Sequence, residues 1–494
     1  MPGSTSAAYP ARGGSAADVV SAPGRGRSLS PTLRKRSTAE VVEFGAPSAA
    51  ACAAAGTLEQ RLRDRTARVA VIGLGYVGLP LVRAAAEAGF FGLGLDIDRR
   101  KVEALNAGQS YIRHIPDESV AALRAGGRFE ASAEFARVAE TDVVLICVPT
   151  PLTRHREPDL SFVVQTVEAL APHLRPGQLI VLESTTYPGT TLEVVKPILE
   201  RAGPRSGIDL FLAYSPERED PGNIDHSTTV TPKVVGGDGE SALRLACIFY
   251  DQFVTRTVPV SSPAVAEAVK LTENIFRAVN IALVNELKIV FEAMGIDVWE
   301  VIEAAKTKPF GYMPFYPGPG LGGHCIPIDP FYLTWKAREH DVATRFIELA
   351  GEVNTAMPRY VVERLALALD AHAAKGLNRA RILIMGLAYK KNVDDTRESP
   401  ALTIMELLER RGAVVAYHDP FLPVIPLSRE HAHFAGRRSI GLEPASVGAF
   451  DAVLIVTDHD GIDYAALVAA ARLVVDTRNA TREVVRHRYR IVHA

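Results

Sequence analysis

The stretch from Val69 to Asp98, VAVIGLGYVGLPLVRAAAEAGFFGLGLDID, is the strongest constraint on how this chain can fold. An apolar strand runs into three glycines spaced G-x-G-x-x-G, a helical pattern follows, and a second strand ends in an acid. Such glycines let a pyrophosphate approach the helix N-terminus, and the acid can bind ribose hydroxyls while repelling a 2′-phosphate. We therefore predict a site for NAD rather than NADP. Its residues are Gly73, Gly75, Tyr76, Val77, Gly78 and Asp96.

More apolar strands follow, each ending in polar or turn-forming residues. Residues 142–148 and 179–182 are continuous apolar runs, as in strands buried on both faces of a parallel sheet. Ligands of such sheets bind outside the carboxyl ends of the strands, which places Pro149, Thr150 and Thr185 at the cofactor mouth. A simple strand cap or turn is the alternative for each of them. A strand at 210–214 leads into the charged loop 215–223, which is either a recognition loop or a solvated charge run.

The period changes to helical in the middle of the chain. Glu267 to Met294 is free of Pro and Gly, and Lys270 and Asn274 share one face of this predicted helix, with Asn285 near that face three turns on. The side chains of Lys270 and Asn274 can donate hydrogen bonds to an oxyanion. The alternative is that they belong to an exposed polar stripe. The loop PGPGLGGHCIPID at 317–329 then holds Cys325, a potential thiolate nucleophile. Further helices are predicted at 331–338 and 361–374.

An α/β pattern restarts near residue 381, with predicted strands at 381–387, 414–417, 451–456 and 472–475. It lacks G-x-G-x-x-G, so it need not bind a dinucleotide. Lys390, Lys391 and Arg397 in its first connection suit phosphate recognition. The predicted fold is α/β, with two Rossmann-like doubly wound units joined by a long central helix and a helical middle domain. The predicted parts are a disordered tail (1–66), an NAD-binding domain (67–262), a helical central domain (263–375) and a second Rossmann-like ligand-binding domain (376–494).

Composition limits the remaining possibilities. The tail is rich in Ala, Ser, Gly and Pro and cannot bury a core, although an organelle transit peptide is an alternative. A formal net charge of −2 argues against nucleic acid or an anionic membrane as a partner. Four widely spaced cysteines show no metal-type pairing, and no apolar run is long enough to span a bilayer. We predict a cytoplasmic protein without a metal.

Six ordered motifs together resemble the nucleotide-sugar 6-dehydrogenases of the UDP-glucose/GDP-mannose dehydrogenase family. They are GLGYVGLP at 73–80, VPTP at 148–151, EST at 183–185, K-L-x-x-N at 270–274, GGHCIPID at 322–329 and AYKKNVDDTRESP at 388–400. The resemblance implies NAD-dependent oxidation of a UDP-sugar at C6 to a carboxylate, a role in polysaccharide synthesis, and a homodimer or larger homo-oligomer formed through the long helix.

The segment SPEREDPGN looks like that of the UDP-N-acetylglucosamine branch, because the UDP-glucose branch has a PEFLREG-type loop at this place. This difference leaves the alignment of Glu219 open. UDP-glucose, UDP-N-acetylmannosamine and UDP-N-acetylgalactosamine are alternative substrates, with pocket residues in the 217–226 and 310–321 loops as the determinants. A two-electron hydroxyacid dehydrogenase would have no use for Cys325. A non-catalytic NAD-binding protein would not need the Lys270, Asn274, Cys325 and Asp329 set.

The resemblance also implies roles for individual residues. Cys325 attacks the intermediate aldehyde, Lys270 and Asn274 hold the oxyanion, Lys270 lowers the pKa of the thiol, and Asp329 orients Lys270 or a water. Thr150 and Glu217 position water and take part in proton transfer. Arg397 reaches cofactor or substrate from the C-terminal unit. The implied substrate-binding residues are Glu217, Arg218, Lys270, Asn274, Gly322, Arg345 and Lys390.

Overall fold

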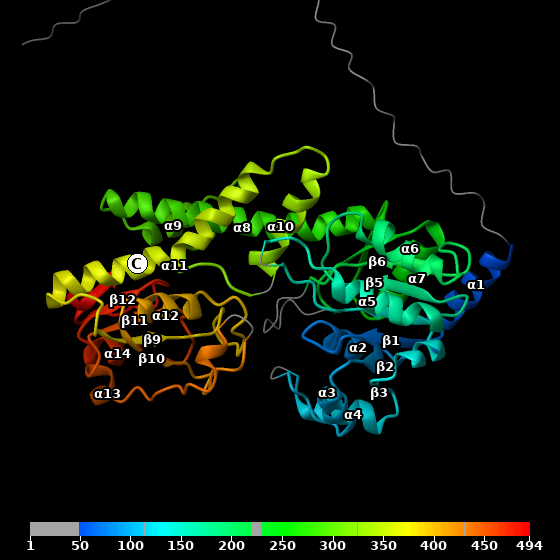
Figure 1. The fold of residues 1–494 in the computed structure, drawn as a ribbon, viewed down its shortest axis with the longest axis horizontal. Helices are drawn as coiled ribbons and strands as arrows, with labels where there is room; N and C mark the ends of the chain where they lie inside the picture. The colour runs from blue at the N-terminus through cyan, green and yellow to red at the C-terminus, as the bar shows by residue number, and fades with distance from the viewer. Residues whose placement is uncertain (1–48, 113–114, 154, 219–228, 324, 429–430) are drawn as a thin grey trace, which may run out of the picture. The chain divides into compact units, whose positions relative to one another are not determined.

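The computed structural model describes residues 49–112, 115–153, 155–218, 229–323, 325–428 and 431–494. Their fold is two α/β units with a helical segment between them in the chain (Figure 1). This is the predicted fold class. Most of the predicted tail (1–48) and Glu219 within the charged loop lie outside the described residues. None of the helices in the described ranges combines the length and the apolar character that crossing a bilayer requires.

The N-terminal unit is a sheet of eight strands in the order β3-β2-β1-β4-β5-β6-β7-β8, parallel except where β7 pairs antiparallel with β6. The strands β1, β4, β5 and β6 are buried along almost their whole length, which explains their continuous apolar sequences. The strands are β1 Arg68–Ile72, β2 Phe91–Leu95, β3 Phe129–Ser132, β4 Val143–Ile146, β5 Leu179–Leu182, β6 Phe211–Tyr214, β7 Lys233–Gly237 and β8 Thr257–Val260. The helices after β1 are α2 Gly78–Glu87, α3 Arg99–Asn106, α4 Asp117–Ala125, α5 Ser161–Leu170, α6 Lys196–Arg201 and α7 Glu240–Tyr250.

The last part of the predicted disordered tail is instead a helix, α1, from Ala49 to Arg63. Alanine is the strongest helix former, and Ala55, Leu58 and Leu62 recur on one face. That face joins the core beside α7, and Arg61 pairs with the buried Asp142 at 2.6 Å. The prediction that residues 49–63 are disordered is therefore wrong. Of the alanines whose burial is described, Ala55 is buried, and Leu58 and Leu62 supply most of the apolar surface that α1 buries.

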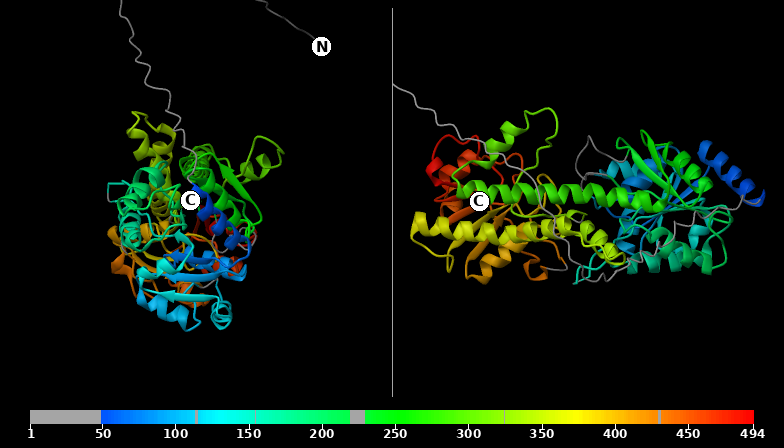
Figure 2. Two further views of the ribbon diagram at one scale, coloured as in Figure 1. Left: turned by 90° about the vertical axis from the view of Figure 1, so that its right-hand side faces the viewer. Right: turned by 90° about the horizontal axis from the view of Figure 1, so that it is seen from above.

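Four helices form the middle segment: α8 Pro263–Ala293, α9 Val298–Ala305, α10 Cys325–Arg338 and α11 Arg345–Ala373. The two long ones, α8 and α11, pack along one another, and α10 packs against both (Figures 1 and 2). Ser262 caps α8 by accepting a hydrogen bond from the amide of Val265. Both α10 and α11 begin earlier than predicted. The start of α10 was missed because its prolines suggested a loop. Pro327 is compatible with the helix, since it falls in the first turn, where no helical N–H is needed.

The C-terminal unit is an all-parallel sheet of five strands in the order β10-β9-β11-β12-β13. Its core lies between this sheet, α12 and the second half of α11. The strands are β9 Arg381–Met385, β10 Val414–His418, β11 Ala452–Ile455, β12 Val474–Asp476 and β13 Ile491–His493. The helices are α12 Pro400–Arg410, α13 Pro444–Gly448 and α14 Tyr464–Ala470.

Candidate active site

The three glycines after β1 each have a distinct physical reason. Gly73 has φ +88°, and a Cβ there would stand 2.5 Å from the carbonyl oxygen of Cys147. A Cβ on Gly78 would clash with the carbonyl oxygen of Gly73, so this glycine permits the close turn into α2. At Gly75 no described atom lies within 4 Å of the Cβ position, which leaves the backbone open to a ligand. Tyr76 and Val77 complete the turn, and it fits a dinucleotide pyrophosphate.

Asp96 stands at the end of β2, where its buried carboxylate faces the glycine turn. One oxygen accepts the amide of Leu74 at 2.9 Å and lies 3.3 Å from the Lys101 ammonium, and the other accepts the amide of Asp98 at 2.9 Å. Tyr111 donates to the carbonyl of Leu74 from the other side. The acid expected to bind ribose thus also fixes the shape of the turn that receives the pyrophosphate.

The carboxyl ends of β4 and β5 are joined by Ser184, whose hydroxyl accepts the amide of Val148 at 3.0 Å and donates to its carbonyl at 2.8 Å. Thr150 is buried, and its carbonyl accepts the hydroxyl of Tyr332 on α10 at 2.9 Å. Pro149 beside it is exposed, and Thr185 is half-buried. The predicted cofactor mouth is therefore one edge of the sheet, covered in part by α10.

Glu183 follows β5 and is fully buried in an ion pair that the sequence did not predict. Its carboxylate lies 2.7 Å from the ammonium of Lys233 and accepts the hydroxyl of Tyr250. Burial raises the pKa of Glu183, and the charge of Lys233 opposes that rise. Lys233 also reaches the carbonyl of Pro216 at 3.3 Å and so supports the turn that carries Glu217.

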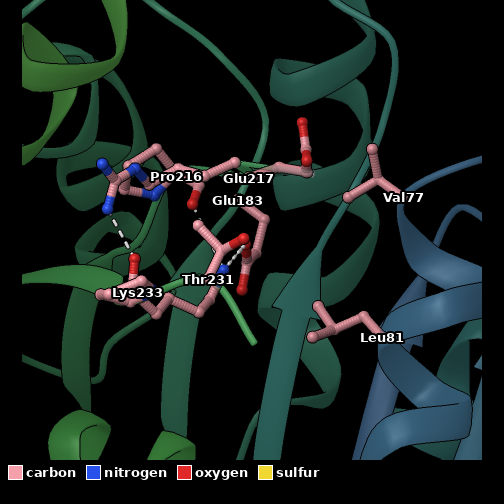
Figure 3. Close-up of a pocket in the computed structure, with 9 residues that line it drawn as sticks. Val77, Leu81, Glu183, Pro216, Glu217, Thr231 and Lys233 are labelled. Atoms are coloured by element: carbon pink, nitrogen blue, oxygen red, sulfur yellow. Dashed lines mark hydrogen bonds and ion pairs between the residues drawn. The ribbon is translucent and has the colours of Figure 1, made fainter. Parts of the chain in front are cut away.

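A small pocket lies between the turn that carries Glu217 and the start of helix α2. Val77, just before α2, and Leu81 on α2 lie across it from Pro216 and Lys233, and Glu217 lines the same pocket (Figure 3). A residue predicted for the cofactor and one predicted for proton transfer therefore line one pocket. Thr231, Pro232, Glu183 and Arg218 complete the lining.

Two polar pairs form the centre of the candidate site. The ammonium of Lys270 donates to the carbonyl oxygen of Glu217 at 2.5 Å and lies 3.4 Å from its carboxylate. One turn later on α8, Asn274 donates to a carboxylate oxygen of Asp329 at 2.6 Å. All four side chains are at least mostly buried. The partner of Asp329 among these contacts is thus Asn274, whereas the sequence predicted Lys270 or a water.

The surroundings of Asp329 strongly shift the pKa of its carboxyl group. Burial raises the pKa of its carboxyl to about 7, with Lys270 and the hydrogen bond from Asn274 opposing the rise. A group that titrates near neutrality can hold and release a proton under working conditions. Asp329 lies on α10, about one turn after Cys325.

Cys325 is the first residue of α10 instead of part of a loop, and its side chain lies outside the described part of the structure. The N-terminus of a helix carries partial positive charge, which favours a thiolate over a thiol. Gly322 and Gly323 precede it and pack on Tyr389 of the C-terminal unit. A Cβ on Gly322 would stand 2.6 Å from the Cβ of Tyr389. Gly322 is thereby explained by packing.

The predicted arginine and lysine contacts are more dispersed. Arg218 pairs with Glu273 on α8 at 2.6 Å, and Arg397 pairs with Asp395 while its guanidinium lies 4.9 Å from the ring centre of Tyr76 in the cofactor turn. Arg397 therefore reaches the cofactor turn from the C-terminal unit. Lys390 is half-buried in the connection after β9. Arg345 is exposed at the first residue of α11.

Asn285 forms a separate set of contacts from the Glu217–Lys270 and Asn274–Asp329 pairs. It donates to Asn354 on α11 at 2.9 Å and accepts the amide of Gly318 at 2.9 Å, which fixes the chain that leads to Cys325. Sequence reasoning missed this role, and it missed Lys233 and Arg478. A lysine beside an apolar strand was the available signal for Lys233. Arg478 follows β12, and a Cβ on Gly318 would stand 2.6 Å from its guanidinium.

Comparison with known proteins gives this geometry a family. The models of the UDP-glucose/GDP-mannose dehydrogenase family match residues 67–254 (NAD binding domain), 264–356 (central domain) and 383–483 (UDP binding domain). The chain belongs to this family. It is an NAD-dependent nucleotide-sugar dehydrogenase that acts on a CH–OH group of a UDP-sugar. NAD, when bound, accepts hydride, and the glycine turn and Asp96 are the residues that fit it.

Individual family members match over most of their length. A UDP-N-acetyl-D-mannosamine dehydrogenase from Pyrococcus horikoshii is 34% identical over 84% of this chain and 96% of its own. A UDP-N-acetyl-D-glucosamine 6-dehydrogenase from Pseudomonas aeruginosa is 36% identical over 79% of this chain and 90% of its own. A solved structure of a UDP-D-ManNAc dehydrogenase from P. horikoshii superimposes with a TM-score of 0.77 at 33% identity, covering 86% of this chain and 98% of that one.

Proposed function

We propose that the protein oxidises the C6 hydroxyl of UDP-N-acetylglucosamine to a carboxylate in two successive hydride transfers, with Cys325 as the covalent nucleophile. The observation that carries this proposal is the adjacency of the Glu217–Lys270 and Asn274–Asp329 pairs, the second of which ends on the helix that begins with Cys325. A protein that only bound NAD would not need a buried acid, amide and ammonium together with a helix that begins at a cysteine.

In the first half-reaction the C6 alcohol loses a hydride and its hydroxyl proton, and an aldehyde forms. Asp329 is the group whose pKa, about 7, best suits it to hold that proton. Glu217 and Thr150 position the water that carries the proton outward. Lys270 and Asn274 donate to the oxygen on which negative charge develops.

In the second half-reaction the thiolate of Cys325 forms a C–S bond with the aldehyde carbon, and the C=O electron pair becomes an oxyanion that Lys270 and Asn274 hold. Loss of the second hydride gives a thioester. Water then attacks the carbonyl carbon, the C–S bond breaks, and the thiolate leaves. A carboxylate and the two protons of the water are released. The covalent bond retains the reactive aldehyde between the two oxidations.

The N-acetylated sugar is favoured by the SPEREDPGN segment and by the names of the relatives. UDP-N-acetyl-D-mannosamine is the second candidate, because the P. horikoshii relative at 34% identity is named for it, against 36% for the P. aeruginosa N-acetyl-D-glucosamine enzyme. We further propose that the protein works in the cytoplasm as a homodimer or larger homo-oligomer.

The deciding measurement is the amount of NADH formed from a limiting quantity of UDP-N-acetylglucosamine, with UDP-N-acetylmannosamine and UDP-glucose in parallel. Two NADH per UDP-N-acetylglucosamine, abolished in Cys325→Ala and retained in the exposed-cysteine control Cys52→Ala, are expected. Two NADH from another sugar alone would overturn the substrate and keep the chemistry. One NADH per sugar from the unsubstituted enzyme would refute the thioester route.

A further inference from the structure

Three strands of the C-terminal sheet end around one buried pair, Asp419 and His459. Asp419 is the residue after β10, and His459 follows β11. Their side chains are 0% and 1% exposed, and His459 Nε2 lies 3.0 Å from Asp419 Oδ2. The chemistry proposed above uses neither residue. A buried charge retained at the carboxyl edge of a Rossmann-like sheet, where ligands bind, calls for a reason.

The carboxylate of Asp419 organises the backbone after β9. Oδ2 accepts the amides of Leu387 at 2.7 Å and Ala388 at 3.1 Å, while Oδ1 accepts those of Phe421 and Leu422 at 2.8 and 3.0 Å. Burial disfavours its charge, yet these hydrogen bonds and the one from His459 hold the pKa of Asp419 below its ordinary value. The carboxylate is therefore ionised, and both of its oxygens accept hydrogen bonds.

His459 extends the same arrangement further along the connection. Its Nδ1 accepts the amide of Asn392 at 3.0 Å, so Nε2 carries the proton that is donated to Asp419. Asn392 has φ +62°, a left-handed conformation, and its side chain exchanges hydrogen bonds with Asp460 in both directions. The histidine tautomer and the turn at Asn392 thus depend on one another.

Together these contacts fix both ends of a short segment, residues 387–392. The carbonyls at its start are also held, that of Leu387 by Ser399 at 2.7 Å and that of Ala388 by Thr457 at 2.6 Å. Tyr389, Lys390 and Lys391 lie between the fixed ends. Tyr389 packs on Gly322 and Gly323, so the segment also borders the chain that leads to Cys325.

We propose that Asp419 and His459 are positioning residues that hold residues 387–392 so that Lys390 can bind the diphosphate of the UDP-sugar. The proposal rests on the assignment of Lys390 to the substrate made above. A lysine on a flexible loop could also bind a diphosphate, but ordering the loop on binding would cost conformational entropy. The buried pair meets that cost during folding.

The test uses UDP as the probe in titration calorimetry on the full chain, because UDP is common to all candidate sugars. In His459→Leu the Kd for UDP is expected to rise about tenfold, the change that corresponds to one lost hydrogen bond, while the Kd for NAD stays constant. His459→Asn offers an oxygen near the Nδ1 position and is expected to restore most of the affinity. The exposed His433→Leu is the matched control.

Turnover and a double-mutant cycle complete the test. In His459→Leu, KM for the sugar should rise, whereas kcat should stay within about threefold of the unsubstituted value. In a Lys390→Met background, adding His459→Leu should have little further effect on UDP binding. A UDP Kd within twofold in His459→Leu, equal losses in the Leu and Asn variants, or additive losses with Lys390→Met would each overturn the proposal. Failure to oxidise N-acetylglucosamine would leave these UDP measurements intact.

Discussion

At the scale of single residues, the site depends on an acid kept out of water. Asp329 is 1% exposed, and its hydrogen bond from Asn274 does not fully offset the loss of hydration. Its pKa of about 7 means that the carboxyl is protonated below neutrality and ionised above it. The acid and amide of this pair are 55 residues apart in the chain, so their distance could not be read from sequence spacing.

This pKa sets a pH dependence. Because the ionised carboxylate is the proposed proton acceptor, kcat should increase as the pH rises through about 7 and level off above it. Asp329→Asn should abolish this acidic limb and lower kcat by about a hundredfold or more. Steady-state turnover from pH 5.5 to 9 checks both, with Asp297→Asn at the N-cap of α9 as the control. An unchanged acidic limb in Asp329→Asn would assign it to another group.

At this scale the sequence anticipated residue types better than partnerships. Lys270 and Asn274 could be placed on one helix face because their spacing is local. Glu183 could not be matched with Lys233, 50 residues later, or with Tyr250, 67 residues later, because only the order of strands in the sheet brings them together. The hydrogen bond from Asn274 to Asp329 was not predicted for the same reason, because the two residues are 55 positions apart.

At the scale of elements, the helix that carries Lys270 and Asn274 is fixed by a buried carboxylate one turn before Lys270. Glu267 on α8 is 0% exposed and accepts the amide of Gly189 at 2.6 Å, the amide of Thr191 at 2.9 Å and the hydroxyl of Thr191 at 2.6 Å. The π-helical turn at Thr191–Val195 begins there, so its free N–H groups stabilise the negative charge.

Glu267→Gln should therefore disturb the first turns of α8. The amide nitrogen would face a backbone N–H instead of accepting from it, which costs about 1–3 kcal/mol of unfolding free energy. We expect kcat to fall because Lys270 shifts relative to Glu217, with little change in the Kd for NAD. Urea unfolding and turnover are the measurements. The control is Glu286→Gln, on an exposed position of the same helix. Wild-type kcat in a destabilised Glu267→Gln would limit Glu267 to folding.

Helix α1 allows a second prediction at this scale. Leu62 is 0% exposed in the core beneath α7, so Leu62→Ala should lower the unfolding free energy by about 2–5 kcal/mol. Turnover at saturating substrates should not change, because α1 lies outside the candidate site. Chemical denaturation followed by circular dichroism measures the loss. Leu427→Ala, at a side chain 81% exposed, should show almost none. Equal stability of both variants would mean that α1 does not belong to the fold.

Elements were predictable where local pattern and tertiary environment agree. The β1–α2–β2 unit has its periods, glycines and acid in order, and the structure forms it as expected. The strands β3, β7, β8 and β13 went unpredicted, because they are short, contain glycine or proline, or are only half-buried. Pro330 inside α10 is a helix breaker in isolation, and only packing against α8 and α11 overrides it.

At the scale of the whole molecule, one face of α8 remains apolar and exposed. Phe276, Leu283, Val290 and Met294 are 49%, 52%, 44% and 64% exposed, and the first three recur every seven residues. Such a seven-residue repeat is what a helix presents to a second helix. This supports the proposed homodimer, with the second copy covering the face.

Leu283→Glu should separate that dimer, because burying an unpaired carboxylate in an apolar seam is costly. Light scattering after size-exclusion chromatography should then give the mass of one chain, 53.3 kDa, in place of twice that value. Leu367→Glu on α11, at a side chain 59% exposed, is the control and should leave the mass unchanged. A Leu283→Glu protein that stays double in mass would place the contact elsewhere.

The 31 residues of α8 also restrict how the gene can change. One inserted codon between Asn274 and Asn285 would turn everything beyond it by about 100° and advance it by about 1.5 Å. Asn285 would then lose the amide of Gly318, and the chain leading to Cys325 would lose its attachment to the helix that carries Lys270. Loops of this protein can therefore gain or lose residues during evolution, whereas the residue count between those two asparagines is fixed.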